Sequence, residues 1–451
     1  MYKFNIRGSI KKELLAELIN EFMEPSEYSF SCDEDAFEIE SEDINEAKKI
    51  VFNLLAKAGL KPPSWGILTG VRPVKLYGEL SERCKNANEA VAMLIERYCL
   101  DGDKARDIKN IYEYQTSFTG KPPENSFGLY IGIPFCPTRC LYCSFTSNQV
   151  TTDEIAKYFE ALKKEISSTG AMTKEARQFP ESIYIGGGTP TTLTSEQLAE
   201  LISLIHDSFD MSMLTEFTVE AGRPDTITEK KLKVLKSGGT DRISINPQST
   251  NGKTLRIIGR GHTPDDIKRA FYDAGKVGFS SINADVIAGL PGEGTSDLVN
   301  SVNEMIALGA DNITVHSLAV KRASRLIDID NAYHYKRGRA VTEMLAASKE
   351  LLCSRGYRPY YLYRLKHMAG AGENTGYCRD DKICLYNVRI MDEHQSVIAL
   401  GSGGISKRYY PAENRLERVA NVTDYKQYID RIDEMTERKA TGLFDREVTQ
   451  C

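Results

Sequence analysis

Short apolar runs alternate with helical patterns between about residues 125 and 325, and this alternation constrains the fold more than any other feature. Each run has the composition of a buried strand, and the stretches between the runs carry apolar residues at helical spacing. The strand-like runs span residues 129–133, 182–185, 216–220, 242–246, 281–287 and 312–316. Such alternation predicts a parallel sheet with right-handed crossovers. Because these units are too few for a closed eightfold barrel, we predict an α/β fold, an open (β/α)6 partial TIM barrel.

Weaker patterns flank this core in the chain of 451 residues. Residues 1–120 alternate strand and helix patterns and then become mainly helical, which predicts an N-terminal α+β/helical domain. Its single tryptophan, Trp65, is expected to fill a gap in a core. We assign the barrel to residues 125–325, and residues 326–451 to a C-terminal α+β extension that covers the substrate. Within the extension we expect two strands and a last helix, at 385–391, 397–400 and 423–439.

The composition excludes several classes of function. A net charge of −5 argues against non-specific nucleic-acid binding, although it leaves room for a local basic pocket. No apolar run approaches the ~18 residues that a membrane span needs, and residues 1–7 do not resemble a secretory signal. The ten cysteines show no pairing pattern, which favours reduced thiols. We therefore expect a cytoplasmic monomer that binds neither nucleic acid nor membranes.

Three cysteines follow the first apolar run with the spacing C-x3-C-x2-C: Cys136, Cys140 and Cys143. A structural zinc site and a fully ligated ferredoxin cluster both need a fourth ligand, which this segment does not supply. The spacing predicts a 4Fe–4S cluster with three cysteine-bound irons and one iron that is free for another ligand. A zinc knuckle or a chance group of thiols is the alternative.

Polar residues recur where the predicted strands end, which is where partial and closed barrels place their catalytic groups. A glycine triplet follows the second strand, and glycine lets backbone approach a ligand at positions where a Cβ would clash. An aspartate within the fifth strand would be costly to bury without a partner. An arginine between two glycines is suited to a forked bond with a carboxylate. The candidates at the strand ends are Gly187, Gly188, Thr189, Glu220, Gln248, Arg260 and Asp285.

The cysteine segment, with Tyr142 just before its last thiol, resembles the cluster motif of radical S-adenosylmethionine (SAM) enzymes. The resemblance implies two cofactors, a 4Fe–4S cluster and SAM. In this family the unique iron chelates the amino and carboxylate groups of SAM, and an electron from the cluster cleaves the sulfonium to a 5′-deoxyadenosyl radical. It implies that Cys136, Cys140 and Cys143 are the metal ligands.

The whole succession from about residue 125 to 325 resembles the oxygen-independent coproporphyrinogen III oxidase family. The resemblance implies that Tyr130 and Tyr142 contact the cofactors, that residues 187–189 hold the amino group of SAM, and that Glu220, Gln248, Arg260 and Asp285 make further SAM contacts. It places Arg260 with the three cysteines in the catalytic set. In this family a propionate loses a hydrogen atom and carbon dioxide to become a vinyl group, twice per porphyrinogen. The partners implied are a tetrapyrrole substrate and a reduced flavodoxin or ferredoxin-type electron donor.

The chain departs from the best-studied members, which have a further cysteine where this sequence has Phe145. Family members with phenylalanine there include haem-carrying proteins without oxidase activity. Three functions therefore stay open: decarboxylation of coproporphyrinogen III to protoporphyrinogen IX, haem delivery, and another radical reaction on a tetrapyrrole. A thiol from Cys378 or Cys384 is the alternative source of a further ligand.

Either tetrapyrrole function needs further groups that the sequence does not rank. A substrate with four carboxylates needs cations, and a haem carrier needs an axial ligand. The candidate cations are Arg242, Arg260, Lys321, Arg322, Arg364 and Lys366. The candidate axial ligands are His316, His262 and His367.

Overall fold

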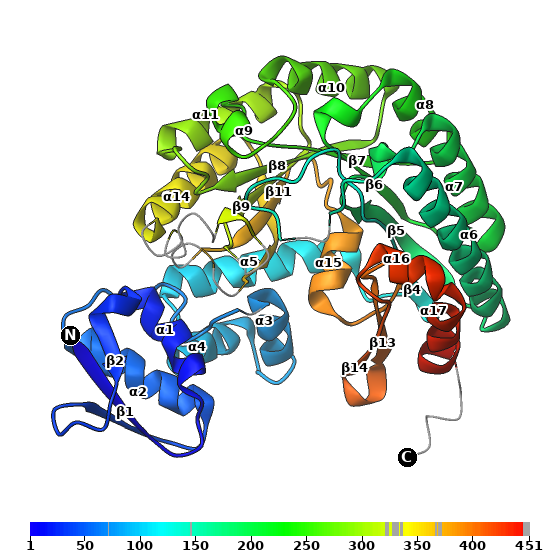
Figure 1. The fold of residues 1–451 in the computed structure, drawn as a ribbon. Coiled ribbons are helices and arrows are strands. Elements are labelled where there is room, and N and C mark those ends of the chain that lie inside the picture. Colours follow the sequence, from blue (N-terminus) through cyan, green and yellow to red (C-terminus); the bar gives the residue numbers. More distant parts are fainter. Residues whose placement is uncertain are drawn as a thin grey trace.

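The computed structural model describes residues 1–70, 72–144, 147–320, 324–326, 333, 337–365, 368 and 372–444. The described strands form a small N-terminal sheet and one large sheet with the order β10-β11-β9-β8-β7-β6-β5-β4-β12-β13-β14. Helices line the outside of the large sheet in an arc, and the N-terminal unit lies beside one end of that arc (Figure 1).

The middle of the large sheet is the predicted partial barrel. Its strands run parallel and in chain order, so that Leu129 pairs with Ile183 and Ile183 with Phe217. The strands are β4 (Ser126–Ile133), β5 (Phe179–Gly187), β6 (Glu216–Gly222), β7 (Arg242–Gln248), β8 (Ser281–Ala288) and β9 (Asn312–Ser317). The outer helices are α6 (Thr152–Glu175), α7 (Ser195–Ser208), α8 (Glu229–Ser237), α10 (Pro264–Val277), α11 (Thr295–Ala307) and α14 (Gly338–Ser354). The predicted α/β fold with an open parallel barrel is confirmed.

Local sequence explains where several of the outer helices begin. Thr151, Thr194 and Thr263 each accept a hydrogen bond from the backbone three residues later, while a Glu, Gln or Asp there bonds back to the cap residue. These reciprocal capping boxes satisfy backbone donors that would otherwise lack partners. The apolar faces of the helices then pack on the strands, whose inner residues are fully buried.

The C-terminal part of the chain extends the sheet at both edges. Strands β10 (Arg358–Tyr363) and β11 (Asn374–Cys378) add antiparallel to the edge at β9. At the opposite edge β12 (Ser396–Leu400) pairs parallel with β4, and the hairpin β13 (Ile405–Tyr410) to β14 (Arg415–Ala420) follows. The strand that precedes the cysteine segment is therefore covered by a strand from far along the chain.

The prediction of a strand at 385–391 is wrong, because this segment forms α15 (Leu385–Asp392). Its buried residues Leu385, Val388 and Arg389 have helical spacing. The carboxylate of Glu216 from β6 accepts the backbone N–H groups of Leu385 at 2.8 Å and of the next residue at 3.1 Å. An acid at a helix N-terminus satisfies free donors and the helix dipole. The predicted last helix is present but divided into α16 (Tyr425–Asp430) and α17 (Ile432–Lys439).

A buried charge network ties the C-terminal helices to the barrel. Lys439 of α17 forms an ion pair of 2.5 Å with Glu165 of α6, and neither side chain is exposed to solvent. Glu165 also accepts hydrogen bonds from Asn421 at 2.8 Å and from the backbone N–H of Gly401, after β12, at 2.7 Å. Such a network satisfies both charges away from water.

The N-terminal unit is a parallel three-stranded sheet with the order β2-β1-β3, followed by helices. Trp65 is fully buried in its core, as predicted, and the guanidinium of Arg364 lies 4.8 Å from the centre of the ring. The elements are β1 (Tyr2–Arg7), β2 (Tyr28–Phe30), β3 (Phe37–Glu40), α1 (Lys12–Phe22), α2 (Ile44–Lys57), α3 (Pro73–Ser81), α4 (Ala87–Tyr98) and α5 (Gly102–Thr119). Within the described residues, no helix is both long and apolar enough to cross a membrane.

Candidate functional site

A cavity of about 400 Å³ opens at the carboxyl ends of the parallel strands. Every site residue predicted from the sequence lines it, although these residues come from several strands and from the cysteine segment. The predicted residues are Tyr130, Cys136, Cys140, Tyr142, Cys143, Gly187, Gly188, Thr189, Glu220, Gln248, Arg260 and Asp285. The structure therefore brings the predicted site together, and the role of each residue stays a prediction.

Hydrogen bonds fix the cysteine segment to its own loop and to the turn at Ile258 and Gly259. The backbone N–H of Cys136 donates to the carbonyl of Asn148 at 3.1 Å, which closes the loop on itself. Further along, the backbone N–H of Leu141 donates to the carbonyl of Ile258 at 3.0 Å, and the hydroxyl of Thr138 donates to that of Gly259 at 2.9 Å. These bonds turn the loop toward the cavity.

The electrostatics of the thiols suit a cationic metal group. Burial raises the pKa of Cys136, and charge on Cys140 and Cys143 adds to the shift, while a 3.4 Å contact with the Thr189 hydroxyl opposes it. Thiols that disfavour one another's ionisation are close together, and bound iron would relieve that repulsion.

The spacing of the thiols also bears on the zinc alternative. Among the described residues no group of three or more Cys, His, Asp or Glu side chains converges on a point that could hold one ion. A single zinc needs sulfurs ~2.3 Å from one centre, whereas a cluster lets each thiolate bind an iron of its own. The three thiols therefore stay the predicted ligands of a cluster, and a zinc knuckle stays the alternative.

The glycine triplet is needed for packing as well as for lining the cavity. A Cβ on Gly188 would lie 2.6 Å from the backbone oxygen of Phe135, and one on Gly187 would lie 3.0 Å from backbone atoms of Ile133. The N–H of Gly188 donates to the carbonyl of Ile133 at 2.8 Å. The triplet thus lets β5 lie against the backbone that leads into the cysteine segment.

Replacing Gly188 with alanine should therefore displace the cysteine segment. We expect a loss of about 1–3 kcal/mol in the free energy of unfolding, as for other overpacked sites, together with a lower iron content. Thermal unfolding and iron analysis measure the two effects. Gly275 in α10 is the control, since a Cβ there meets nothing within 4 Å; Gly275→Ala should be neutral or stabilising. Equal behaviour of the two variants would contradict the packing role.

Three buried polar atoms at the cavity lack hydrogen-bond partners among the described residues: Oγ of Ser147, the side-chain oxygen of Gln248 and Nε of Arg260. The other guanidinium nitrogens of Arg260 donate to the carbonyl of Asn246 at 3.0 Å and to the hydroxyl of Tyr142 at 3.1 Å. Gln248 has a φ of 70°, where side chains other than glycine are uncommon. An unpaired buried acceptor and donor are costly unless a ligand satisfies them, which fits the predicted contacts with SAM.

Glu220 and Asp285 differ in protonation although both line the cavity. Burial raises the pKa of Glu220 to about 7, although a hydrogen bond of 2.7 Å from the Tyr184 hydroxyl acts to lower it. Burial by itself would raise the pKa of Asp285 as well. The contacts of this carboxylate with His316, at 3.6 Å, and with Asn283, at 2.8 Å, outweigh burial, so that the pKa of Asp285 is lowered. Glu220 is therefore the carboxyl that can change charge near neutral pH.

Several lining residues were not predicted as site residues. Tyr184 and Asn283 stand on the same strands, where alternate-residue counting from the predicted strand ends was the available clue, and Arg223 directly follows β6. Others, Tyr361, Tyr363 and Leu365, come from β10 and the turn after it. The contribution of the C-terminal extension to the cavity wall is consistent with its predicted covering role.

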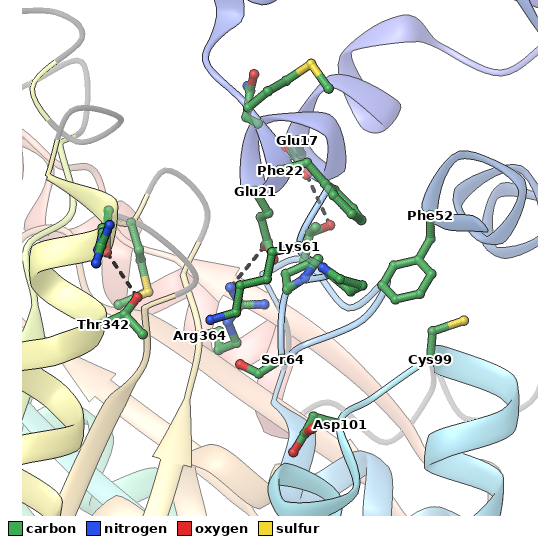
Figure 2. A pocket seen from close by; sticks show the side chains of 18 of the residues that line it. Glu17, Glu21, Phe22, Phe52, Lys61, Ser64, Cys99, Asp101, Thr342 and Arg364 are labelled. Atoms are coloured by element: carbon green, nitrogen blue, oxygen red, sulfur yellow. Dashed lines mark hydrogen bonds and ion pairs between the residues drawn. The ribbon is translucent and has the colours of Figure 1, made fainter. Parts of the chain in front are cut away.

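Two of the predicted substrate cations lie outside the cavity. Arg242 begins β7, at the opposite end of the barrel, and pairs there with Glu216 at 3.4 Å. Arg364 pairs with Glu21 at 3.0 Å in a separate cavity of about 1060 Å³ between the N-terminal unit and α14, as Figure 2 shows. Lys321, Arg322 and Lys366 lie outside the described residues. Of the cations that the structure describes, Arg260 and Arg223 line the strand-end cavity.

The larger cavity is a poor match for the predicted substrate. Acidic side chains outnumber basic ones on its wall: Glu17, Glu21, Glu24, Glu27, Asp101 and Glu343 stand against Lys61, Arg339 and Arg364. A ligand with four carboxylates would be repelled there. The strand-end cavity, although smaller, is therefore the candidate site.

The candidate extra thiols and two of the three candidate axial ligands either do not line the strand-end cavity or lie outside the described residues. Cys378 and Cys384 are buried away from the cavity, and burial raises the pKa of Cys378 to about 11. They are ordinary buried thiols. His262 is buried 3.8 Å from Asp225 and does not line the cavity, whereas His316 does. Phe145 and His367 lie outside the described residues.

Comparison with known proteins places this geometry in context. The family model of the radical SAM superfamily matches residues 130–305. The oxygen-independent coproporphyrinogen-III oxidase-like protein HemZ of Bacillus subtilis (strain 168) is 36% identical over 405 residues, which are 88% of this chain and 81% of that protein. The heme chaperone HemW of the same organism is 38% identical over 193 residues, 43% of this chain and 50% of HemW.

Among solved structures, coproporphyrinogen III oxidase HemN from Escherichia coli superimposes with a TM-score of 0.55 at 22% identity. The match covers 72% of this chain and 73% of that one. At this identity the likeness shows a shared fold.

Proposed function

This chain belongs to the radical SAM superfamily, in its branch of HemN- and HemZ-like proteins, and we propose that it decarboxylates coproporphyrinogen III to protoporphyrinogen IX. Its cofactors are those of the superfamily, a 4Fe–4S cluster and SAM. The observation that carries the proposal is the single strand-end cavity lined by all the predicted cluster and SAM residues. The similarity to HemZ, which extends over most of both chains, supports the choice of reaction.

In this proposal the residues of the chain divide the work by position. The three thiolates hold the cluster at the mouth of the barrel, with Thr189 beside Cys136. The unpaired amide oxygen of Gln248 and the unpaired Nε of Arg260 orient SAM. When bound, the cluster and SAM would supply the radical that removes a hydrogen atom from a propionate side chain; formation of the vinyl group then releases carbon dioxide and one electron, which a one-electron acceptor must take up. The tyrosines from β10 close the cavity, which limits the access of water to a reactive species.

One anaerobic experiment tests the reaction. Reconstituted protein is incubated with coproporphyrinogen III, SAM and a reductant, and the tetrapyrroles and 5′-deoxyadenosine are analysed by mass spectrometry. We expect a monovinyl product followed by a divinyl product, with two deoxyadenosines per protoporphyrinogen. A methylated or ring-opened product would replace this proposal with another radical reaction, and an unchanged porphyrinogen would reject it.

A second candidate, haem delivery, is favoured by one observation. The chain has Phe145 at the position where a fourth cysteine was expected, and it is 38% identical over 193 residues to a heme chaperone. This function predicts stoichiometric haem binding with a shifted Soret band and no vinyl product. His316, the predicted axial ligand that lines the cavity, is the residue to replace: His316→Ala should alter the Soret band only if this function is correct.

The protonation of Glu220 gives a pH-dependent prediction for SAM binding. Below a pKa of about 7 the carboxyl is neutral, and above it the carboxylate attracts the positive sulfonium of SAM. We expect the affinity for SAM to rise about tenfold between about pH 6 and pH 8, since the charged fraction rises by that factor. Equilibrium binding to reconstituted protein measures it. In the variant Glu220→Gln the carboxyl is absent, whereas any titration of SAM itself is the same as with the parent protein. If the affinity of this variant for SAM depends on pH as in the parent, Glu220 does not have the proposed role.

A further inference from the structure

We propose that the exposed face of the short helix α9 (Gly252–Ile257) and of the turn that follows it is the docking surface for an acidic protein that carries single electrons. The inference rests on the radical SAM function proposed above, since enzymes of this superfamily need a reductant. The surface, named here the α9 face, consists of Lys253, Arg256, Ile257, Gly259 and Pro137, all of them exposed.

The α9 face lies directly against the cysteine segment. The carbonyl of Ile258 accepts the backbone N–H of Leu141, the residue after Cys140, at 3.0 Å. The carbonyl of Gly259 accepts the hydroxyl of Thr138 at 2.9 Å. A protein seated on this face would be separated from the ligands of the cluster by little more than the backbone of the loop. The electron would leave the carrier, which is oxidised by one electron, and reduce the cluster by one.

The charge of the α9 face is opposite to that of the molecule. The whole chain has a net charge of −5 and would repel an acidic partner, so association needs a local basic patch. Lys253 and Arg256 project from α9 and form no ion pair in the part of the chain that the structure describes. Two acids of the helices that follow have partners of their own: Asp266 pairs with Arg269, and Asp297 accepts a hydrogen bond from Asn251 at 3.2 Å.

An exposed apolar side chain stands among these cations. Ile257 is 42% exposed, which makes it one of few large hydrophobic residues on the described surface, while the adjacent Ile258 is fully buried and anchors the turn. Transient electron-transfer interfaces are small, and a central apolar residue within a charged rim supplies most of their binding energy. The combination of Ile257 with two unpaired cations fits such an interface.

The test compares two reductants on the anaerobically reconstituted protein. The first is dithionite, a small chemical reductant that needs no docking surface, and the second is a reduced acidic flavodoxin. The test variant is Lys253→Glu with Arg256→Glu, and the matched control is Lys11→Glu with Lys12→Glu, which reverses two exposed lysines of the N-terminal unit that form no ion pair with the described residues. Stopped-flow absorbance follows reduction of the cluster, and titration calorimetry measures binding of oxidised flavodoxin.

We expect reduction by flavodoxin to slow by about tenfold or more at low salt in the test variant, with weaker binding, since charge steering accelerates association by 10–10³. The difference should shrink as salt rises, because screening shortens the reach of exposed charges. Dithionite should reduce the test variant, the control and the parent protein equally. The single change Ile257→Ser should weaken binding without altering the salt dependence.

The outcomes separate the two proposals. If dithionite fails to reduce any of the proteins, the radical SAM function is in error and not only the surface. Two outcomes in which dithionite succeeds would reject the α9 face as the docking surface. In one, flavodoxin reduces the test variant as fast as the parent protein; in the other, reduction by flavodoxin is slowed equally in the test variant and in the control.

Discussion

Cys140→Ala should abolish the cluster and every activity that depends on it. Cys140 is the middle thiol of the segment and is largely buried at the cavity, so no solvent-exposed group can replace it as a ligand. Losing a residue that only orients a metal ligand costs 10–100-fold, and losing the ligand itself should cost more than ~100-fold in turnover. Visible absorption, iron content and deoxyadenosine formation measure the loss.

The control for this variant is Cys353→Ala. Cys353 is exposed on α14 and does not line the cavity, so its removal should leave iron content and turnover unchanged. A Cys140→Ala protein that retained its cofactor and full activity would overturn the proposed cluster, and with it the assignment of the other two thiols.

Lys439→Met should produce the largest loss of stability. The change leaves the carboxylate of Glu165 buried without its cation, and breaking a buried pair in this way costs about 3–5 kcal/mol. Such a loss is a large share of the 5–15 kcal/mol that typically stabilises a domain. Glu165 also accepts a hydrogen bond from the backbone after β12. The denaturant concentration at the midpoint of unfolding should therefore decrease for the barrel as well as for α17.

The exposed lysine next to Glu165 provides the comparison. Lys164 pairs with Asp433 across the same contact between α6 and α17, but both side chains are at least half exposed. Its replacement by methionine should cost no more than about 1 kcal/mol, the range of surface ion pairs. If Lys164→Met and Lys439→Met destabilise the protein equally, burial does not decide the strength of these pairs.

The barrel was predictable because its strands are buried on both faces and therefore appear as apolar runs. The site was predictable for a related reason: parallel strands place their carboxyl ends at one edge, so residues such as Glu220 and Asp285 had to meet there. Arg242 could have been excluded by the same argument, since it begins its strand and so lies at the other end of the barrel.

The rest depended on contacts that the sequence does not display. Residues 385–391 have a composition typical of strands, and their helix is stabilised by Glu216 from a distant strand. In β10 successive side chains point to opposite faces of the sheet. Tyr361 and Tyr363 therefore line the strand-end cavity, whereas Arg364, just beyond the strand, lines the larger cavity. Without the register of that strand, the tyrosines could not be separated from the arginine.

The parallel pairing of β12 with β4 has a consequence for how the protein is made. During translation β4 emerges from the ribosome long before β12, so Ser396 can pair with Phe127 only after all the outer helices and strands between them have been made. Until then one edge of the strand that carries the cysteine segment remains uncovered on the nascent chain. We expect iron and sulfide to be inserted only after β12 has emerged, so that ribosome-bound chains stalled before β12 contain no cluster.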